Sequence, residues 1–212
     1  MQEILHQISI WIILLPLITG LWLSKKLSHK SLIILFLIIA ATPPQLISNF
    51  FSKNLRNSFY NVYTIIEFFI LYLYFKGRFY SISCKRIFKG TFILYCIISL
   101  AILFTSKSIS ARFISEWVSV NNLFYLLWIV IYFRDQYLLP EMELTFRDPF
   151  SWSLLGIFIY AACTSLHFVL YDIIQSSYLS IFQSSFNILL YTLFAISFIK
   201  DKMLQPQIKL EY

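Results

Sequence analysis

Long apolar runs separated by short polar gaps are the dominant pattern of this sequence. A helix needs about 20 apolar residues to cross the hydrocarbon core of a bilayer, and seven runs come close to that length. Residues 31–41 are apolar on every side, whereas a transmembrane β-strand alternates apolar and polar residues. We therefore predict an all-α bundle of seven transmembrane helices. The spans are expected at residues 4–23, 31–50, 59–75, 88–105, 114–133, 152–172 and 180–199.

The composition supports lipid as the main solvent for the chain. Of its 212 residues, 59% are hydrophobic and 13% are charged, and the mean hydropathy is +0.74. A soluble core of this size could not bury so much apolar surface. The connections between the runs are too short to hold a further folded unit. Residues 1–212 are therefore expected to form a single transmembrane domain.

The distribution of basic residues predicts the orientation of the bundle. Connections rich in Lys and Arg stay on the cytoplasmic side of a membrane. Of the 17 basic residues, four fall on the same side as the N-terminus, namely Lys53, Arg56, Lys107 and Arg112. The N-terminus is therefore expected outside and the C-terminus inside. Because the basic residues cluster in these gaps, the net charge of +7 does not indicate a nucleic-acid partner.

Glu67 is the most prominent polar residue inside a predicted span. Tyr60, Tyr63 and Tyr74 lie at helical spacings from it, on or near the same face. A charged carboxylate at mid-helix costs roughly 2.5–3.5 kcal/mol, and each flanking large apolar residue returns about 0.3–0.6 kcal/mol. The span can therefore insert despite Glu67, and insertion does not explain why the residue is there. A functional role and a structural hydrogen bond between helices both remain open.

Polar side chains also form stripes on three later runs, within residues 115–125, 152–171 and 183–191. Each stripe alone fits ordinary packing, since polar contacts between membrane helices are common. In the predicted topology, however, four of the polar residues reach one level, about 8–14 Å below the outer ends of their helices. A shared level indicates a cavity open to the outside. The candidate ligand pocket comprises Glu67, Tyr63, Asn122, His167, Asn187 and Tyr191.

Two consecutive prolines interrupt the second run. Pro43 and Pro44 lack backbone donors and are expected to kink the helix, freeing carbonyls that can face a cavity or bond Thr42. The stretch resembles the motif of PQ-loop transporters. In those proteins a second copy lies inside another span, whereas here the other Pro-Gln pair, residues 206–207, falls in the C-terminal tail. The matching positions are Pro44, Gln45, Asn49 and Lys53.

A broader resemblance covers much of the chain. It rests on residues 60–68 in the third span, 148–152 before the sixth and 185–188 in the seventh. These stretches are similar to a family of small seven-helix membrane proteins of Bacteroidetes-type bacteria, whose members have no assigned activity. The resemblance implies a location in the bacterial inner (cytoplasmic) membrane. Because some of those proteins accompany signalling proteins, it also implies a sensory role.

Several function classes are excluded by the motifs that the sequence lacks. It has no Gly-rich phosphate loop, no HExxH or GxSxG motif and no His cluster with ligand spacing. We therefore expect no enzyme activity, no metal and no other cofactor. A rhodopsin would need a lysine within the last span to form its Schiff base. Lys200 lies at the rim of that span, which excludes this class.

Two classes of function remain after these exclusions. The first is a receptor-like or accessory membrane subunit with an outward-facing pocket for a small apolar or aromatic ligand. It would signal to a cytoplasmic or membrane protein partner through the connections at residues 76–89 and 134–149. The second is a small-solute transporter, which the two prolines favour and the absence of inverted repeats disfavours. A structural subunit of a larger membrane complex is a further alternative.

Overall fold

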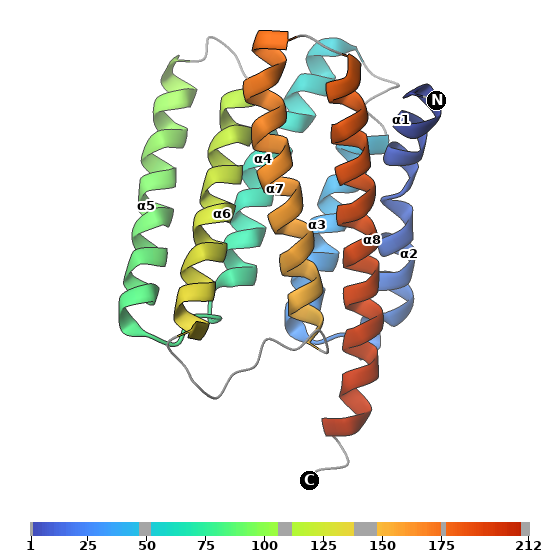
Figure 1. Ribbon diagram of the computed structural model, residues 1–212, viewed down its shortest axis with the longest axis vertical. Coiled ribbons are helices and arrows are strands. Elements are labelled where there is room, and N and C mark those ends of the chain that lie inside the picture. The colour runs from blue at the N-terminus through green and yellow to red at the C-terminus, as the bar shows by residue number, and fades with distance from the viewer. Residues whose placement is uncertain (1, 47–51, 106–111, 138–147, 175–176, 209–212) are drawn as a thin grey trace.

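The computed structural model is a bundle of long helices that lie side by side (Figure 1). It describes residues 2–46, 52–105, 112–137, 148–174 and 177–208. Within these ranges, side chains are described except at residues 2, 53, 166–174, 177–180 and 205–208. All regular structure in the described ranges is helical, which confirms the predicted all-α bundle.

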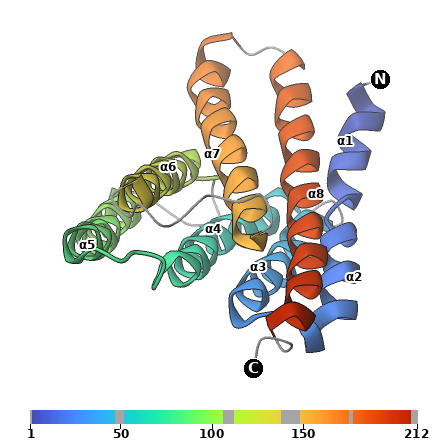
Figure 2. The ribbon, with the colours of Figure 1, turned by 60° about the horizontal axis from the view of Figure 1, so that its bottom comes forward.

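Eight α-helices and one short 3-10 helix make up the described part of the chain. Figure 2 shows α4, α5 and α6 nearly end-on while α1, α7 and α8 are seen lengthwise, so the two groups are inclined to each other. The elements are α1 (Gln2–Trp11), α2 (Leu14–Leu23), η1 (Ser24–Lys26), α3 (His29–Leu46), α4 (Lys53–Phe75), α5 (Ile82–Thr105), α6 (Ser115–Tyr137), α7 (Pro149–Ile174) and α8 (Ser177–Ile208).

Six helical segments are long and apolar enough to cross a membrane, which are the proportions of an integral membrane protein. Each overlaps a predicted span. The seventh predicted span, residues 152–172, coincides with α7, whose described apolar part is the shorter stretch Pro149–Ser165. The count of seven spans and the orientation therefore stay predictions. The six segments are Glu3–Lys26, His29–Leu46, Asn54–Phe75, Ile82–Thr105, Ser115–Tyr137 and Ile181–Leu204.

Several helices begin earlier or end later than the predicted spans. Helix α4 starts at Lys53 rather than at residue 59, and α5 starts at Ile82 rather than at residue 88. Hydropathy marks the part of a helix that lies in hydrocarbon, whereas backbone hydrogen bonding continues into the polar interface. The end of the predicted span 31–50 falls partly on residues 47–50, which lie outside the described residues.

The first span consists of two helices rather than one. Helix α1 ends at Trp11 and α2 begins at Leu14. Pro16 has no backbone N–H, so the Ile12 carbonyl cannot receive the usual helical bond from it. The Ile12 carbonyl instead accepts the N–H of Leu15 at 2.9 Å, which is the tighter spacing of a 3-10 turn. The single helix predicted over residues 4–23 is therefore interrupted.

Close contact between α2, α3 and α8 depends on Gly20. A Cβ atom at this position would lie 2.6 Å from Leu35 Cδ1 and 2.8 Å from Phe198 Cε2. Small residues allow membrane helices to approach closely in this way. Helix α5 lies at the opposite edge of the bundle (Figures 1 and 2). It is anchored there by Trp128 of α6, whose Nε1 donates to Thr91 Oγ1 at 2.8 Å.

Three aspartates order the end of the bundle opposite the N-terminus. Asp201 of α8 accepts the N–H of Ser28, just before α3, at 2.6 Å. Asp135 of α6 accepts the N–H groups of Tyr80 and Ser81, just before α5. Asp148 accepts the N–H of Phe150 at 3.0 Å in the first turn of α7. A carboxylate at a helix N-terminus satisfies free donors and complements the helix dipole, so each cap fixes where a helix begins.

Candidate functional site

A cavity of about 260 Å³ lies inside the half of the bundle that carries the N-terminus. Helices α1, α4, α6 and α8 all begin at this end, and α3 ends there. Side chains from these five helices and from α7 form its walls. The lining residues are His6, Ser9, Ile10, Gln45, Tyr60, Tyr63, Thr64, Glu67, Phe113, Val118, Tyr160, Gln183, Ser184, Asn187, Leu190 and Tyr191.

Glu67 lies at the inner limit of this cavity. At 1.5 Å rise per residue it is about 20 Å along α4 from Lys53, near the middle of the helix. It also lines an adjoining chamber of about 20 Å³, together with Tyr125 of α6. A chamber of that volume has room for about one water molecule. Glu67 is partly exposed, and the space that it reaches is this internal one.

The Glu67 carboxyl has no hydrogen-bonding partner among the described residues. A buried polar group normally finds such a partner, and an unpaired one is costly in a membrane. The sequence left open that Glu67 makes a structural hydrogen bond between helices. The described residues show no such bond. Tyr63, Tyr160 and Tyr191 surround the carboxyl, since all three line both the cavity and the inner chamber.

Gln45 bridges three helices at the cavity wall. Its Nε2 donates to the carbonyl oxygen of Ser9 in α1 at 2.7 Å. Its Oε1 accepts the hydroxyl of Tyr191 in α8 at 2.9 Å. Both hydrogen-bonding ends of the side chain are thus in use, which holds α1, α3 and α8 together beside the cavity. In the sequence Gln45 stood out only as part of the PQ-loop resemblance.

The structure brings together four of the six predicted pocket residues. Tyr63, Glu67, Asn187 and Tyr191 all line the cavity. They come from α4 and α8, which are far apart in the sequence but both contribute to this cavity. His167 belongs to α7, but its side chain lies outside the described residues.

Asn122 does not line the cavity, contrary to the prediction. Val118 and Tyr125, which lie on the same face of α6, reach the cavity and the inner chamber respectively. Asn122 lies between them in the sequence, but it is 1% exposed and does not line either space. The adjacent Asn121 makes the contact to α4 instead, donating from Nδ2 to the carbonyl of Thr64 at 2.7 Å.

Two further expectations about site residues need correction. Tyr74 was expected near the face of Glu67, but its ring packs on Phe150, with centroids 5.3 Å apart, in the other half of the bundle. Pro43 and Pro44 lie inside α3, which continues through them to Leu46, the last described residue before position 52. Thr42 bonds the carbonyl of Ile38 at 2.8 Å, and not the carbonyls that the prolines leave without donors.

Tyr160 is the main site residue that the sequence-based pocket omits. It lies in the polar stripe of α7 and lines both parts of the cavity. The sequence identifies this stripe, but the pocket residue predicted from it is His167, two helical turns further along α7. The predicted pocket also omits His6 and Ser9, although Gln2, His6 and Ser9 fall on one face of α1 at helical spacing, a signal that could have identified them.

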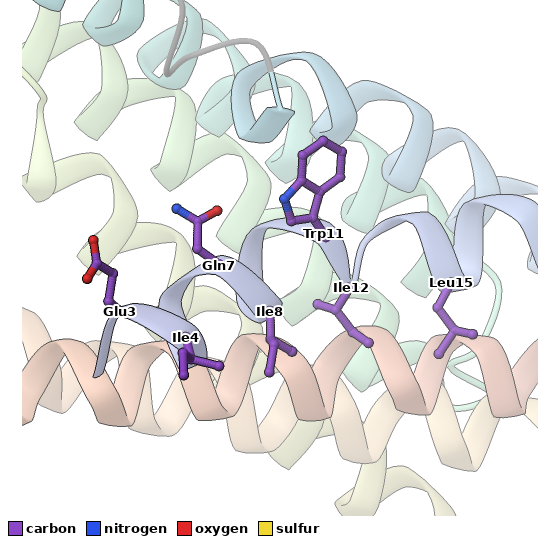
Figure 3. A pocket seen from close by; sticks show the side chains of 7 residues that line it. All are labelled: Glu3, Ile4, Gln7, Ile8, Trp11, Ile12 and Leu15. Atoms are coloured by element: carbon purple, nitrogen blue, oxygen red, sulfur yellow. The ribbon is translucent and has the colours of Figure 1, made fainter. Parts of the chain in front are cut away.

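A larger hollow of about 650 Å³ lies on the outer surface of α1 and the start of α2 (Figure 3). Ile4, Ile8, Ile12 and Leu15 lie along one side of the helix there, and Trp11 lies on the other. All of its lining residues come from one stretch of chain, and Trp11 is 55% exposed. This hollow is an open apolar surface of the kind that lipid covers, so the internal cavity is the candidate site.

Comparison with known proteins finds no matching family model, no similar curated protein and no similar solved structure. The resemblance to a seven-helix bacterial family therefore stays a prediction. Among the described residues there is also no group of three His, Cys, Asp or Glu side chains that could hold a metal ion. The internal cavity is therefore the feature of the described residues that best indicates a function.

Proposed function

We propose that this chain is a receptor-like or accessory subunit of the bacterial inner membrane that binds a small ligand in the Glu67 cavity. The observation that carries the proposal is a carboxyl group near the middle of the bundle that faces an internal space and has no protein partner among the described residues. An ionisable residue at such a depth makes membrane insertion more costly, and residues of this kind usually face a ligand site or an ion pathway. The proposal includes no catalytic role.

The position of the cavity favours entry from outside the cell. In the proposed topology of seven spans, the N-terminus is exterior, and the cavity lies in that half of the bundle. The described basic residues at the opposite end include Lys25, Lys76, Lys85 and Lys200. Basic residues mark the cytoplasmic side. A ligand would thus arrive from the side opposite to that of a cytoplasmic partner.

Passing a signal requires a partner protein in this proposal. The described residues contain no folded unit outside the helix bundle. The connection between α4 and α5 starts directly below the helix that carries Glu67. A shift of α4 on ligand binding would therefore reach the segment around Lys76 and Arg78 at the cytoplasmic end. Arg78 packs over the ring of Phe150, 3.9 Å from its centroid, which couples that segment to α7.

A binding assay with the protein in lipid nanodiscs tests this proposal. A panel of small polar and aromatic compounds would be screened for a rise in the unfolding temperature of the wild type. The expected result is at least one compound whose effect is lost in Glu67→Gln and kept in Glu116→Gln, a matched change at an exposed position of α6. Stabilisation that persists in Glu67→Gln would place the binding elsewhere and contradict the proposal.

A second measurement distinguishes the receptor-like subunit from the alternative, a small-solute transporter. The stabilising compound would be followed in proteoliposomes that contain only this chain. A receptor or accessory subunit is expected to bind the compound without moving it across the membrane. Accumulation inside the vesicles that exceeds the leak of protein-free vesicles would replace the receptor proposal with a transporter.

A further inference from the structure

The charge balance of the cavity indicates what kind of molecule it accepts. Glu67 is the one acidic residue among the described residues that line it, and these residues include no Lys or Arg. His6 is the one lining residue that can carry a positive charge, and it is exposed near the start of α1. A carboxyl group at this depth favours its neutral form, and a cation beside it is needed to stabilise the ionised form. The described lining supplies none at the depth of Glu67.

The walls around Glu67 are aromatic. Tyr63 comes from α4, Tyr160 from α7 and Tyr191 from α8, and each lines the space on both sides of the carboxyl. Tyr60 lines the wider part, and Tyr125 lines the inner chamber. The face of an aromatic ring attracts a cation, most strongly where water is excluded, and rings arranged around a space are the usual way to hold a quaternary ammonium group.

The volume limits the size of the ligand. A cavity of about 150 Å³ is enough for a benzene-sized molecule. The 260 Å³ found here therefore fits a head group of that size with a short polar extension. Asn187 and Gln183 of α8 line the same cavity and can hydrogen-bond such an extension.

We infer that the Glu67 cavity binds a small organic cation, an ammonium group that pairs with the carboxylate and lies among the tyrosine rings. This inference rests on the proposed function and specifies its ligand class. Glu67 supplies the negative charge, and Tyr63, Tyr160 and Tyr191 supply ring faces for the methyl or methylene groups next to the nitrogen. A bare divalent metal ion does not fit as well, because Glu67 is the one carboxylate among the described lining residues and would balance only half of its charge.

A pair of molecules with the same shape and different charge tests the inference. Choline and its uncharged carbon isostere 3,3-dimethylbutan-1-ol would be titrated against the wild-type protein in nanodiscs, with tetramethylammonium and benzylammonium as further cations. At least one of the three cations is expected to bind. Where choline binds, the isostere is expected to bind at least about tenfold more weakly, because it lacks the positive charge that the carboxylate and the ring faces attract. Equal binding of choline and its isostere, or no binding of any cation, would overturn the inference.

Three variants separate the contributions to binding. Glu67→Gln is expected to weaken cation binding by at least about tenfold, because it removes the charge and keeps the shape. Tyr63→Leu is expected to weaken it about two- to thirtyfold by removing one ring face. Glu116→Gln removes a carboxylate that lies outside the cavity and should leave cation affinity unchanged. Wild-type cation affinity in Glu67→Gln would also overturn the inference.

Labelling separates this inference from the proposed function. In a variant without Cys84, Cys96 and Cys163, a cysteine at Asn187 would be treated with a membrane-impermeant maleimide applied from outside. Labelling without any cation binding would overturn the cation inference and leave an outward cavity in place. Absence of labelling would contradict the outward-facing cavity, and with it the proposed function.

Discussion

The hydroxyl of Tyr191 donates to Oε1 of Gln45 at 2.9 Å and thereby joins α8 to the last described turn of α3. Because the same Gln45 side chain also bonds the backbone of α1 at Ser9, the two bonds hold α1, α3 and α8 together at the cavity wall before any ligand arrives. A pre-formed wall lowers the entropic cost of binding. The tyrosine is thus a support for the cavity as well as part of its lining.

Replacing Tyr191 by Phe should weaken this support without removing the ring. The loss of one hydrogen bond between membrane helices is expected to cost about 0.6 kcal/mol, and at most about 1.7 kcal/mol. Reversible unfolding in detergent would measure the change. Tyr137→Phe is the control, since that side chain is 90% exposed. If both variants unfold alike, the bond to Gln45 contributes nothing to stability.

Gly20→Ala should destabilise the bundle more than any other Gly→Ala change at a described glycine in a helix. The added methyl group would lie 2.6 Å from Leu35 Cδ1 and 2.8 Å from Phe198 Cε2. Overpacking of this kind typically costs about 1–3 kcal/mol. Gly90→Ala is the matched change in α5, where no atom lies within 4 Å, and should stabilise the helix by up to about 1 kcal/mol. Equal effects would show that α2, α3 and α8 are not closely packed.

Asp135→Asn should lower stability by about 1–3 kcal/mol, because an amide can accept with only one of the two oxygens that now cap α5. Unfolding in detergent would again measure the change. Glu116→Gln serves as the comparison, since it breaks the exposed ion pair with Arg112 and should cost no more than about 1 kcal/mol. A neutral Asp135→Asn variant would mean that α5 begins without this cap.

Ser52 and Tyr80 should be labelled from opposite sides of the membrane. Ser52 precedes α4 and Tyr80 precedes α5, and both side chains are exposed. In a cysteine-free background, Ser52→Cys is expected to react with an impermeant maleimide outside intact cells, and Tyr80→Cys only after permeabilisation. Reaction of Tyr80→Cys in intact cells would reverse the proposed orientation.

Much of the bundle could be predicted because apolar length is a direct requirement of the membrane. Hydropathy located six of the helices that the structure shows to be long and apolar enough to cross it. It placed helix ends poorly, as at Lys53 and Ile82, because polar residues at the interface stay helical. The break after Trp11 could have been inferred from Pro16, since a proline always removes one backbone donor.

The site was harder to predict than the fold. Glu67 was found because a carboxylate in an apolar run is an exception that demands an explanation. Helical spacing predicts Asn122 as a pocket residue, yet Asn122 is buried and does not line the cavity. Whether a polar side chain on the right face reaches a cavity depends on how the neighbouring helices pack around it. That information is held in the packing and not in the periodicity.

The aspartates at the starts of α3, α5 and α7 have a consequence for how the protein sits among lipids. Asp135, Asp148 and Asp201 each engage backbone N–H groups, and the described residues contain no ion pair that joins them to Lys or Arg. The exposed ammonium groups of Lys25, Lys76 and Lys85 at that end can therefore reach the phosphates of anionic phospholipids, which attract juxtamembrane basic residues. Phosphatidylglycerol or cardiolipin in the leaflet at that end would hold this surface more firmly than a zwitterionic bilayer.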